Sequence, residues 1–138
     1  MRKDDRADGM HHRAADEQAP SDVRRLGVLG TLIWDTIHPP GRHEECTEEW
    51  GGISYSLEAL ATALPRNWVV RPILKLGADL AERSLEYLQT IPGIQIETPL
   101  QVTSGPHTRV ELRYGDQAQR TEQISGEIPT WGLDQLGP

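Results

Sequence analysis

The sequence predicts an α/β fold in three layers, with helices on a parallel sheet and a small antiparallel lid beside it. Three observations carry this prediction. Nearly continuous apolar runs at residues 26–34 and 68–76 are typical of strands buried on both faces. A stretch with helical apolar spacing follows each run, and this order of strands and helices predicts parallel strands with right-handed crossovers. A strictly alternating segment at 109–114 predicts one arm of a hairpin.

The composition fits one modest domain, or part of a larger one, and argues against several classes of partner. The chain has 138 residues, 36% of them hydrophobic, with four Trp and no Phe, so the core should rest on Leu, Ile, Val and Trp. Because residues 1–25 carry six basic and six acidic side chains, the net charge of −7 falls on residues 26–138. An acidic domain without a basic patch argues against binding to nucleic acid or to an anionic membrane.

The single cysteine and the lack of an apolar span predict a cytoplasmic protein. Cys46 has no partner for an internal disulfide, which fits a reducing compartment. Together with His38 and His43 it lacks a fourth ligand at the usual spacing, so no metal site is predicted. No apolar run reaches the ~20 residues needed to cross a bilayer, and the N-terminus has no apolar signal-peptide core.

Asp35 is a candidate for ligand binding because of its expected place in the sheet. Residues 1–24 are dense in charge and predict a disordered leader, and either Met1 or Met10 could be the true start. The first apolar run then ends at Asp35, which we expect at the carboxyl end of a buried strand. Ligands of open α/β sheets bind at that edge. A Glu-rich flap at 42–50 follows as an exposed segment.

The glycine pair Gly51-Gly52 stands directly before an amphipathic helix and is the stretch best suited to a ligand. Two glycines let the backbone approach a bound group, and the first free N–H groups of a helix suit hydroxyls or anions. The simpler alternative is a tight turn into a packed helix. Further along, Pro72 predicts an edge strand or a bulge, Asp79 predicts the cap of a second helix, and Lys75 should be a solvated side chain.

The alternating segment belongs to a predicted hairpin at 109–124 with one apolar face. Together with the flap it would form a lid over the candidate site. Arg109 and Glu111 share a face of the hairpin, from which they could reach the site or form a surface pair. Residues 128–134 predict the start of another helix close to the end of the chain, which favours a truncated domain.

Four features, in this order, resemble the N-terminal half of the pfkB, or ribokinase-like, carbohydrate kinases. They are the strand ending in Asp35, the flap that leads to Gly51-Gly52 and a helix, Gly77-Ala78-Asp79 after the next strand, and the hairpin around Thr108-Arg109-Val110. The resemblance implies a Rossmann-like (ribokinase-like) domain over residues 25–138, incomplete relative to the family, with lid segments at 36–50 and 106–124. It also implies that Asp35 and the amides near Gly51 and Gly52 hold sugar hydroxyls, and that the lid makes a homodimer contact.

Two departures from the family pattern limit what the resemblance implies. Many members have Asn four residues after the second glycine, where this chain has Ser56, so the acceptor, a sugar or a nucleoside, stays open. The catalytic motif Asp-Thr-x-Gly-Ala-Gly-Asp is absent, and Gly77-Ala78-Asp79 lacks its Thr and first glycine, so no catalytic residue is assigned in this chain. The resemblance thus implies an ATP- and Mg²⁺-dependent kinase as the full protein, of which this chain alone binds at most the acceptor.

Two other interpretations stay open. The chain could be a non-catalytic interaction or dimerisation remnant, since an unfinished sheet exposes unpaired backbone groups. It could also be half of a dinucleotide-binding fold, with Gly27 and Gly30 near the first strand, although these do not form a Gly-x-Gly-x-x-Gly turn before a helix. The lack of a Gly-x-x-x-x-Gly-Lys-Ser/Thr loop argues against a P-loop nucleotide site.

Overall fold

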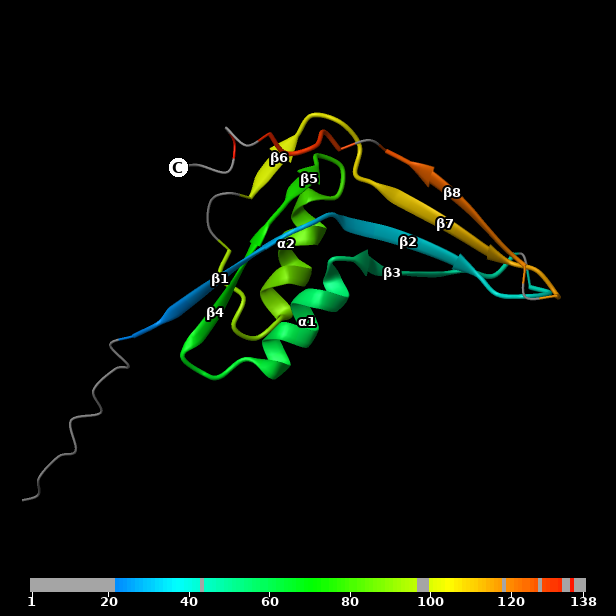
Figure 1. The fold of residues 1–138 in the computed structure, drawn as a ribbon. Coiled ribbons are helices and arrows are strands. Elements are labelled where there is room, and N and C mark those ends of the chain that lie inside the picture. The colour runs from blue at the N-terminus through cyan, green and yellow to red at the C-terminus, as the bar shows by residue number, and fades with distance from the viewer. Residues whose placement is uncertain are drawn as a thin grey trace, which may run out of the picture.

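The computed structural model describes residues 22–42, 44–96, 100–117, 119–126, 128–132 and 135. They form a small α/β body from which a four-stranded sheet extends like an arm (Figure 1). Most of the predicted leader lies outside the described residues, and the first strand begins at Arg24. No helix in the described part of the chain is long and apolar enough to cross a membrane.

The body is built on parallel strand pairs, as the apolar runs predict. β1 (Arg24–Leu29) pairs with β4 (Trp68–Ile73), and β5 (Lys75–Gly77) pairs with β6 (Gln101–Thr103). A parallel bridge between Val70 and Ile94 adds a third strand position beside β4. The predicted alternation of strands and helices is therefore confirmed for the body.

Two helices lie on the same side of the body strands (Figure 1). These are α1 (Ser54–Ala63) and α2 (Ala81–Thr90). The predicted apolar stripes are confirmed, because Leu57 of α1 and Leu88 of α2 are fully buried in one cluster with Val70 of β4. Burial of such a side chain stabilises a fold by about 1.5–3 kcal/mol, so this cluster is what holds the helices on the strands.

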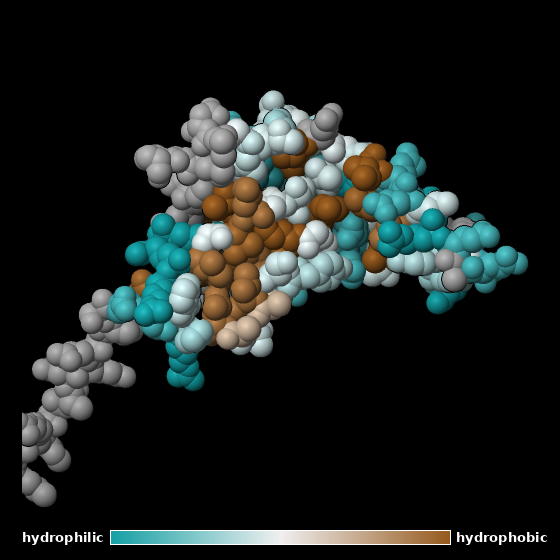
Figure 2. Space-filling model, in the orientation of Figure 1, coloured by the Kyte–Doolittle hydropathy of each residue, from teal (hydrophilic) through white to brown (hydrophobic). Residues whose placement is uncertain are grey.

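The other side of the body strands carries no helix among the described residues. Leu29, at the end of β1, is 51% exposed, and Figure 2 shows an apolar surface over this part of the body. The predicted three-layer arrangement is therefore not found in the described part of the chain, where the body has two layers and an apolar outward face.

The arm is a mixed sheet, which we call the lid sheet. Its strand order is β3-β2-β7-β8, formed by β2 (Leu32–His38), β3 (Thr47–Gly52), β7 (Arg109–Tyr114) and β8 (Arg120–Ser125). β2 is antiparallel to β3 but parallel to β7, so the sheet is not the purely antiparallel lid that the sequence predicts. The predicted hairpin is confirmed as the antiparallel pair of β7 and β8. Residues of both expected lid segments, 36–50 and 106–124, lie in this sheet.

The first apolar run is not one strand, contrary to the prediction. It divides at Gly30 and Thr31, so that β1 stays in the body while β2 joins the lid sheet. A Cβ on Gly30 would lie 2.5 Å from Ile53 Cδ1, so the glycine leaves room for that side chain. Asp35 consequently lies in the middle of β2, not at the carboxyl end of a body strand.

The second apolar run is also interrupted, two residues after Pro72, whereas the sequence predicts an edge strand or a bulge there. β4 ends at Ile73 and β5 begins at Lys75, with Leu74 fully buried between them. At the other end of the chain, residues 128–132 contain no helix, so the helix start predicted at 128–134 is not found among the described residues.

Candidate functional site

The two faces of the lid sheet differ in what covers them. Because side chains alternate along a strand, Asp35 and Trp34 point to opposite faces. Asp35 stands opposite Glu49 of β3 and Val110 of β7, and Val110 stands opposite Ile124 of β8. We call the face with these side chains the open face, because Ile124 there is 65% exposed. The face that carries Trp34 is the packed face.

The carboxylate of Asp35 lies directly over Gly51. A Cβ built on Gly51 would lie 2.7 Å from Asp35 Cγ and still closer to Oδ2, so only glycine allows the carboxylate to occupy this position. Asp35 is 9% exposed. Burial raises the pKa of its carboxyl, and the charges of Glu49 and Glu122 raise that pKa further. The fold thus places two of the candidate residues in contact.

The second glycine forms the corner at which β3 turns into α1. Gly52 has φ +66°, a left-handed backbone conformation that favours glycine, and the next N–H, of Ile53, donates to the Thr31 carbonyl at 3.0 Å. No side chain caps the start of α1, and its first turn holds no acidic residue. Ser56 lies exposed in this first turn. The amides there suit an external hydrogen-bond acceptor, as a free helix N-terminus does.

The packed face of the lid sheet is closed by aromatic contacts with α2. The Trp34 and Trp50 rings meet edge to face with centroids 4.7 Å apart, and Trp50 stacks on Tyr87 of α2 at 5.6 Å. The Arg83 guanidinium lies 4.0 Å from the centre of the Trp34 ring, and Trp34 Nε1 donates to Glu48 at 3.4 Å. Trp34 is therefore a core residue, as predicted, and its ring is covered by these contacts.

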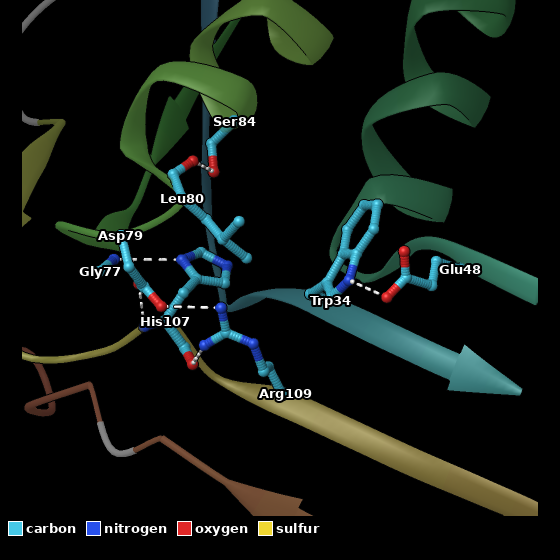
Figure 3. A network of polar contacts seen from close by, with 8 residues as sticks. All are labelled: Trp34, Glu48, Gly77, Asp79, Leu80, Ser84, His107 and Arg109. Carbon is cyan, nitrogen blue, oxygen red and sulfur yellow. Dashed lines mark hydrogen bonds and ion pairs between the residues drawn. The ribbon is translucent and has the colours of Figure 1, made fainter.

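A polar network joins the start of α2 to the strand β7 (Figure 3). Asp79 Oδ1 accepts the His107 N–H at 2.7 Å, and Oδ2 pairs with Arg109 Nη2 at 2.7 Å. Burial by itself raises the pKa of Asp79, but the His107 N–H and Arg109 outweigh it and hold this pKa below its ordinary value. The prediction that Asp79 caps α2 is wrong: the N-cap is Leu80, without a side-chain cap, and Asp79 holds the lid instead.

The structure does not bring Arg109 and Glu111 to Asp35. In the register of β2 and β7 they stand opposite Trp34 and Thr36, on the packed face. Arg109 is held by Asp79, while a Glu111 oxygen lies 2.9 Å from His38 Nε2 and also pairs with Arg113. Both candidate residues thus serve contacts within the lid sheet and with the body.

His107 is a residue that the sequence analysis missed. It is fully buried, its Nδ1 accepts the Gly77 N–H at 3.0 Å, and its ring lies against Trp50. Burial lowers the pKa of its imidazole. A Cβ on Gly77 would overlap the His107 backbone, so Gly77 is needed for this close approach. No local pattern distinguishes His107, because its partners come from β3 and β5.

Within the described residues, no three His, Cys, Asp or Glu side chains gather closely enough to hold a metal ion. His43, one member of the sequence cluster considered above, lies outside those residues. The site that the structure describes is therefore a carboxylate, a glycine corner and a helix N-terminus.

Comparison with solved structures identifies the fold. The chain is similar to a nucleoside kinase from Burkholderia thailandensis in complex with inosine, with a TM-score of 0.56 and 16% identity over 74% of this chain. It is also similar to a nucleoside kinase of Methanocaldococcus jannaschii, an archaeal member of the ribokinase family, with a TM-score of 0.59 and 10% identity over 75%. A ribokinase from Cryptococcus neoformans var. grubii in complex with ADP gives 0.55 and 19% over 78%. The chain has a ribokinase-like fold.

This ribokinase-like chain spans only part of those kinases. It covers 37% of the length of each of the three. No protein-family model and no curated protein matches its sequence. The identities are low enough that the likeness shows the fold and leaves the activity to be argued from the residues.

Proposed function

We propose that this chain is the N-terminal, acceptor-binding portion of a pfkB-type carbohydrate kinase, an enzyme that transfers a phosphoryl group from ATP to a sugar hydroxyl. The observation that carries the proposal is the contact of Asp35 with Gly51 beside the uncapped start of α1. The ribokinase-like fold supports it, and the neighbours described above include a nucleoside kinase with inosine. The acceptor is accordingly a sugar or a nucleoside.

In the proposed binding mode, Asp35 accepts hydrogen bonds from one or two hydroxyls. The amides at Gly51, Gly52 and the first turn of α1 donate to others, and the Ser56 hydroxyl lies within the same turn. Ile124 of the open face, whose side chain is 65% exposed, offers an apolar surface for the C–H groups of the ring. A mixture of a few directed polar groups and an apolar surface is typical of small-molecule sites.

The proposal assigns no chemical step to this chain. ATP and Mg²⁺ are the cofactors of the complete kinase, but no described cluster of side chains fits the ion, and the proposal gives this chain no part in binding either group. We expect the acceptor to bind to residues 1–138 without turnover. A coupled ATPase assay with a panel of sugars and nucleosides checks this, and turnover by the chain alone would contradict it.

Calorimetric titration with ribose, fructose, adenosine and inosine tests the binding site. Asp35→Ala should weaken binding by at least tenfold, because a hydrogen bond to a charged group contributes about 1.5–3 kcal/mol. Glu86→Gln is the matched control, since it removes a carboxylate from the exposed surface of α2. Equal affinities of the Asp35→Ala variant and the unmodified chain would refute the assigned site.

One observation favours a second function, an interaction module that pairs through the lid. β8 is an edge strand that is exposed along its whole length, and such an edge can pair with another chain. Light scattering after size exclusion tests this homodimer, and a monomer at all concentrations would count against it. A dinucleotide-binding half is less well supported, because β2 and not a helix follows Gly27 and Gly30. Titration with NAD(H) should accordingly leave the tryptophan fluorescence unchanged.

A further inference from the structure

Lys75 is buried, although the sequence predicts a solvated side chain. It is the first residue of β5 and is 5% exposed. Its ammonium group donates to the Thr130 carbonyl at 2.7 Å and to Gln135 Oε1 at 2.9 Å, and it lies 4.8 Å from the centre of the Trp131 ring. The segment that follows the lid hairpin thus folds back and covers this lysine.

The groups that the structure describes around the Lys75 ammonium include no anion. All three groups around the ammonium are formally neutral: a carbonyl, an amide oxygen and an aromatic ring. No carboxylate among the described residues pairs with it. Removing an ammonium from water is costly unless an opposite charge compensates, and this chain, with a net charge of −7, offers many carboxylates elsewhere. A buried cation without a negative partner among the described residues indicates a place for an anion.

A small cavity adjoins this lysine at the carboxyl end of β1. Its volume is about 80 Å³, and its lining consists of Gly30, Thr31, Lys75 and residues 128–131. This space is large enough for several water molecules or one small oxyanion. Its position also agrees with the general rule that ligands of α/β sheets bind beyond the carboxyl ends of the strands.

We propose that the cavity beside Lys75 binds a small oxyanion of the phosphate class, either the free ion or the phosphoryl group of an ester. Lys75 supplies the charge, and the hydroxyls of Thr31 and Thr130, two residues of the lining, are the donors that can add to it. Gln135 is exposed and can give up its bond to the ammonium in favour of the anion. The site is distinct from the open face and does not depend on the proposed sugar binding.

Titration with sodium phosphate, against sodium chloride of equal ionic strength, tests the proposal. The unmodified chain should show a saturable rise in Tm with phosphate alone, together with a change in tryptophan emission, because Trp131 lies against Lys75. Lys75→Met should raise the Kd for phosphate at least tenfold, and Lys75→Arg should largely retain binding. The matched control is Arg66→Gln, which removes an exposed cation and should change nothing.

Three results would overturn the proposal: an unchanged Kd in Lys75→Met, an equal loss of binding in Arg66→Gln, or an equal response to chloride. If Lys75→Met does not fold, Trp131→Phe decides the matter. In that variant the rise in Tm should remain while the emission change disappears, and a persisting emission change would place the anion elsewhere. Methyl phosphate, titrated in parallel, distinguishes the sources: equal binding favours a phosphate ester, and weaker binding favours the free ion.

Discussion

The contact between Asp35 and Gly51 makes a prediction that needs no ligand. In Gly51→Ala the new methyl group would lie 2.7 Å from Asp35 Cγ, so the whole carboxyl group must rotate away. Overpacking of this kind costs about 1–3 kcal/mol of the free energy of unfolding. In an Asp35→Ala background the clash is gone, and alanine is otherwise favoured over glycine in a strand by about 0.5–1 kcal/mol.

The two variants should therefore be strongly coupled. Gly51→Ala should destabilise the unmodified chain by about 2 kcal/mol but should be neutral or slightly stabilising beside Asp35→Ala, which gives a coupling of about 2–3 kcal/mol. Urea denaturation of the four proteins, followed by tryptophan fluorescence, measures this coupling. Gly52→Ala is the control, because its strain comes from a positive φ and from overlap with the Thr31 carbonyl, and neither depends on Asp35.

Additive effects of Gly51→Ala and Asp35→Ala would refute the reasoning, since they would mean that the added methyl group does not touch the Asp35 carboxyl group. The same variants also connect the contact to binding. If the carboxylate must occupy this position to hold a hydroxyl, Gly51→Ala and Asp35→Ala should raise the Kd for the sugar or nucleoside to a similar degree, by about 10- to 100-fold. If the Gly51→Ala variant binds the sugar or nucleoside normally, Asp35 is not part of the binding site.

Three further predictions concern the polar network that holds the lid. Asp79→Asn should lower the free energy of unfolding by about 1 kcal/mol in urea denaturation, because it loses a half-exposed ion pair with Arg109 but keeps an acceptor for the His107 N–H. Burial lowers the pKa of His107, so below pH ~6.5 only the unfolded chain takes up this proton. Stability should fall as the pH drops from about 6.5 to the folded-state pKa, by up to ~1.4 kcal/mol per pH unit, and His107→Gln should reduce that slope. Gly126→Ala should lower the free energy of unfolding by about 1–3 kcal/mol, because Gly126 has φ +72° and a Cβ there would lie 2.8 Å from the His107 carbonyl carbon. Thermal denaturation measures this loss as a lower Tm.

Features of the fold that depend on local patterns could be predicted from the sequence. Helical spacing predicted the two helices, whose Leu57 and Leu88 lie in the core, and strict alternation predicted the hairpin of β7 and β8. These patterns work because the geometry of a helix or a strand alone decides which of its residues share a face. The order of the elements then sufficed to predict the parallel pairing of the body strands.

Features that depend on distant partners could not be predicted in the same way. β1 and β2 are separated at Gly30, where the side chain of Ile53 fills the space of a Cβ, and no pattern near Gly30 reveals this contact. Asp79 has the sequence context of a helix cap, yet the backbone of His107 and the charge of Arg109 bind its carboxylate instead. A charge-assisted pair outweighs a cap, and only the tertiary structure brings the pair together.

The candidate site also combines features that local patterns predict with features that depend on distant partners. The glycine pair could be predicted because two glycines directly before a helix favour a tight turn or a close approach to a ligand, and the resemblance placed Asp35 beside them. The face of Arg109 and Glu111 could not be predicted, because it depends on the register of β7 against β2, and a shift by one residue reverses every side chain. That register places both residues on the packed face, away from Asp35.

The distribution of charge between the two proposed sites limits what each can bind. On the open face, Asp35 is close enough to Glu49 and Glu122 for their charges to raise its pKa, and the same field repels any anion. A neutral polyol meets no such penalty and can offer its hydroxyls to the carboxylate. The cavity beside Lys75 has the opposite sign and attracts anions. A sugar phosphate should therefore be rejected by the open face even where the parent sugar binds, and salt should weaken that discrimination, because screening reduces the repulsion between exposed charges.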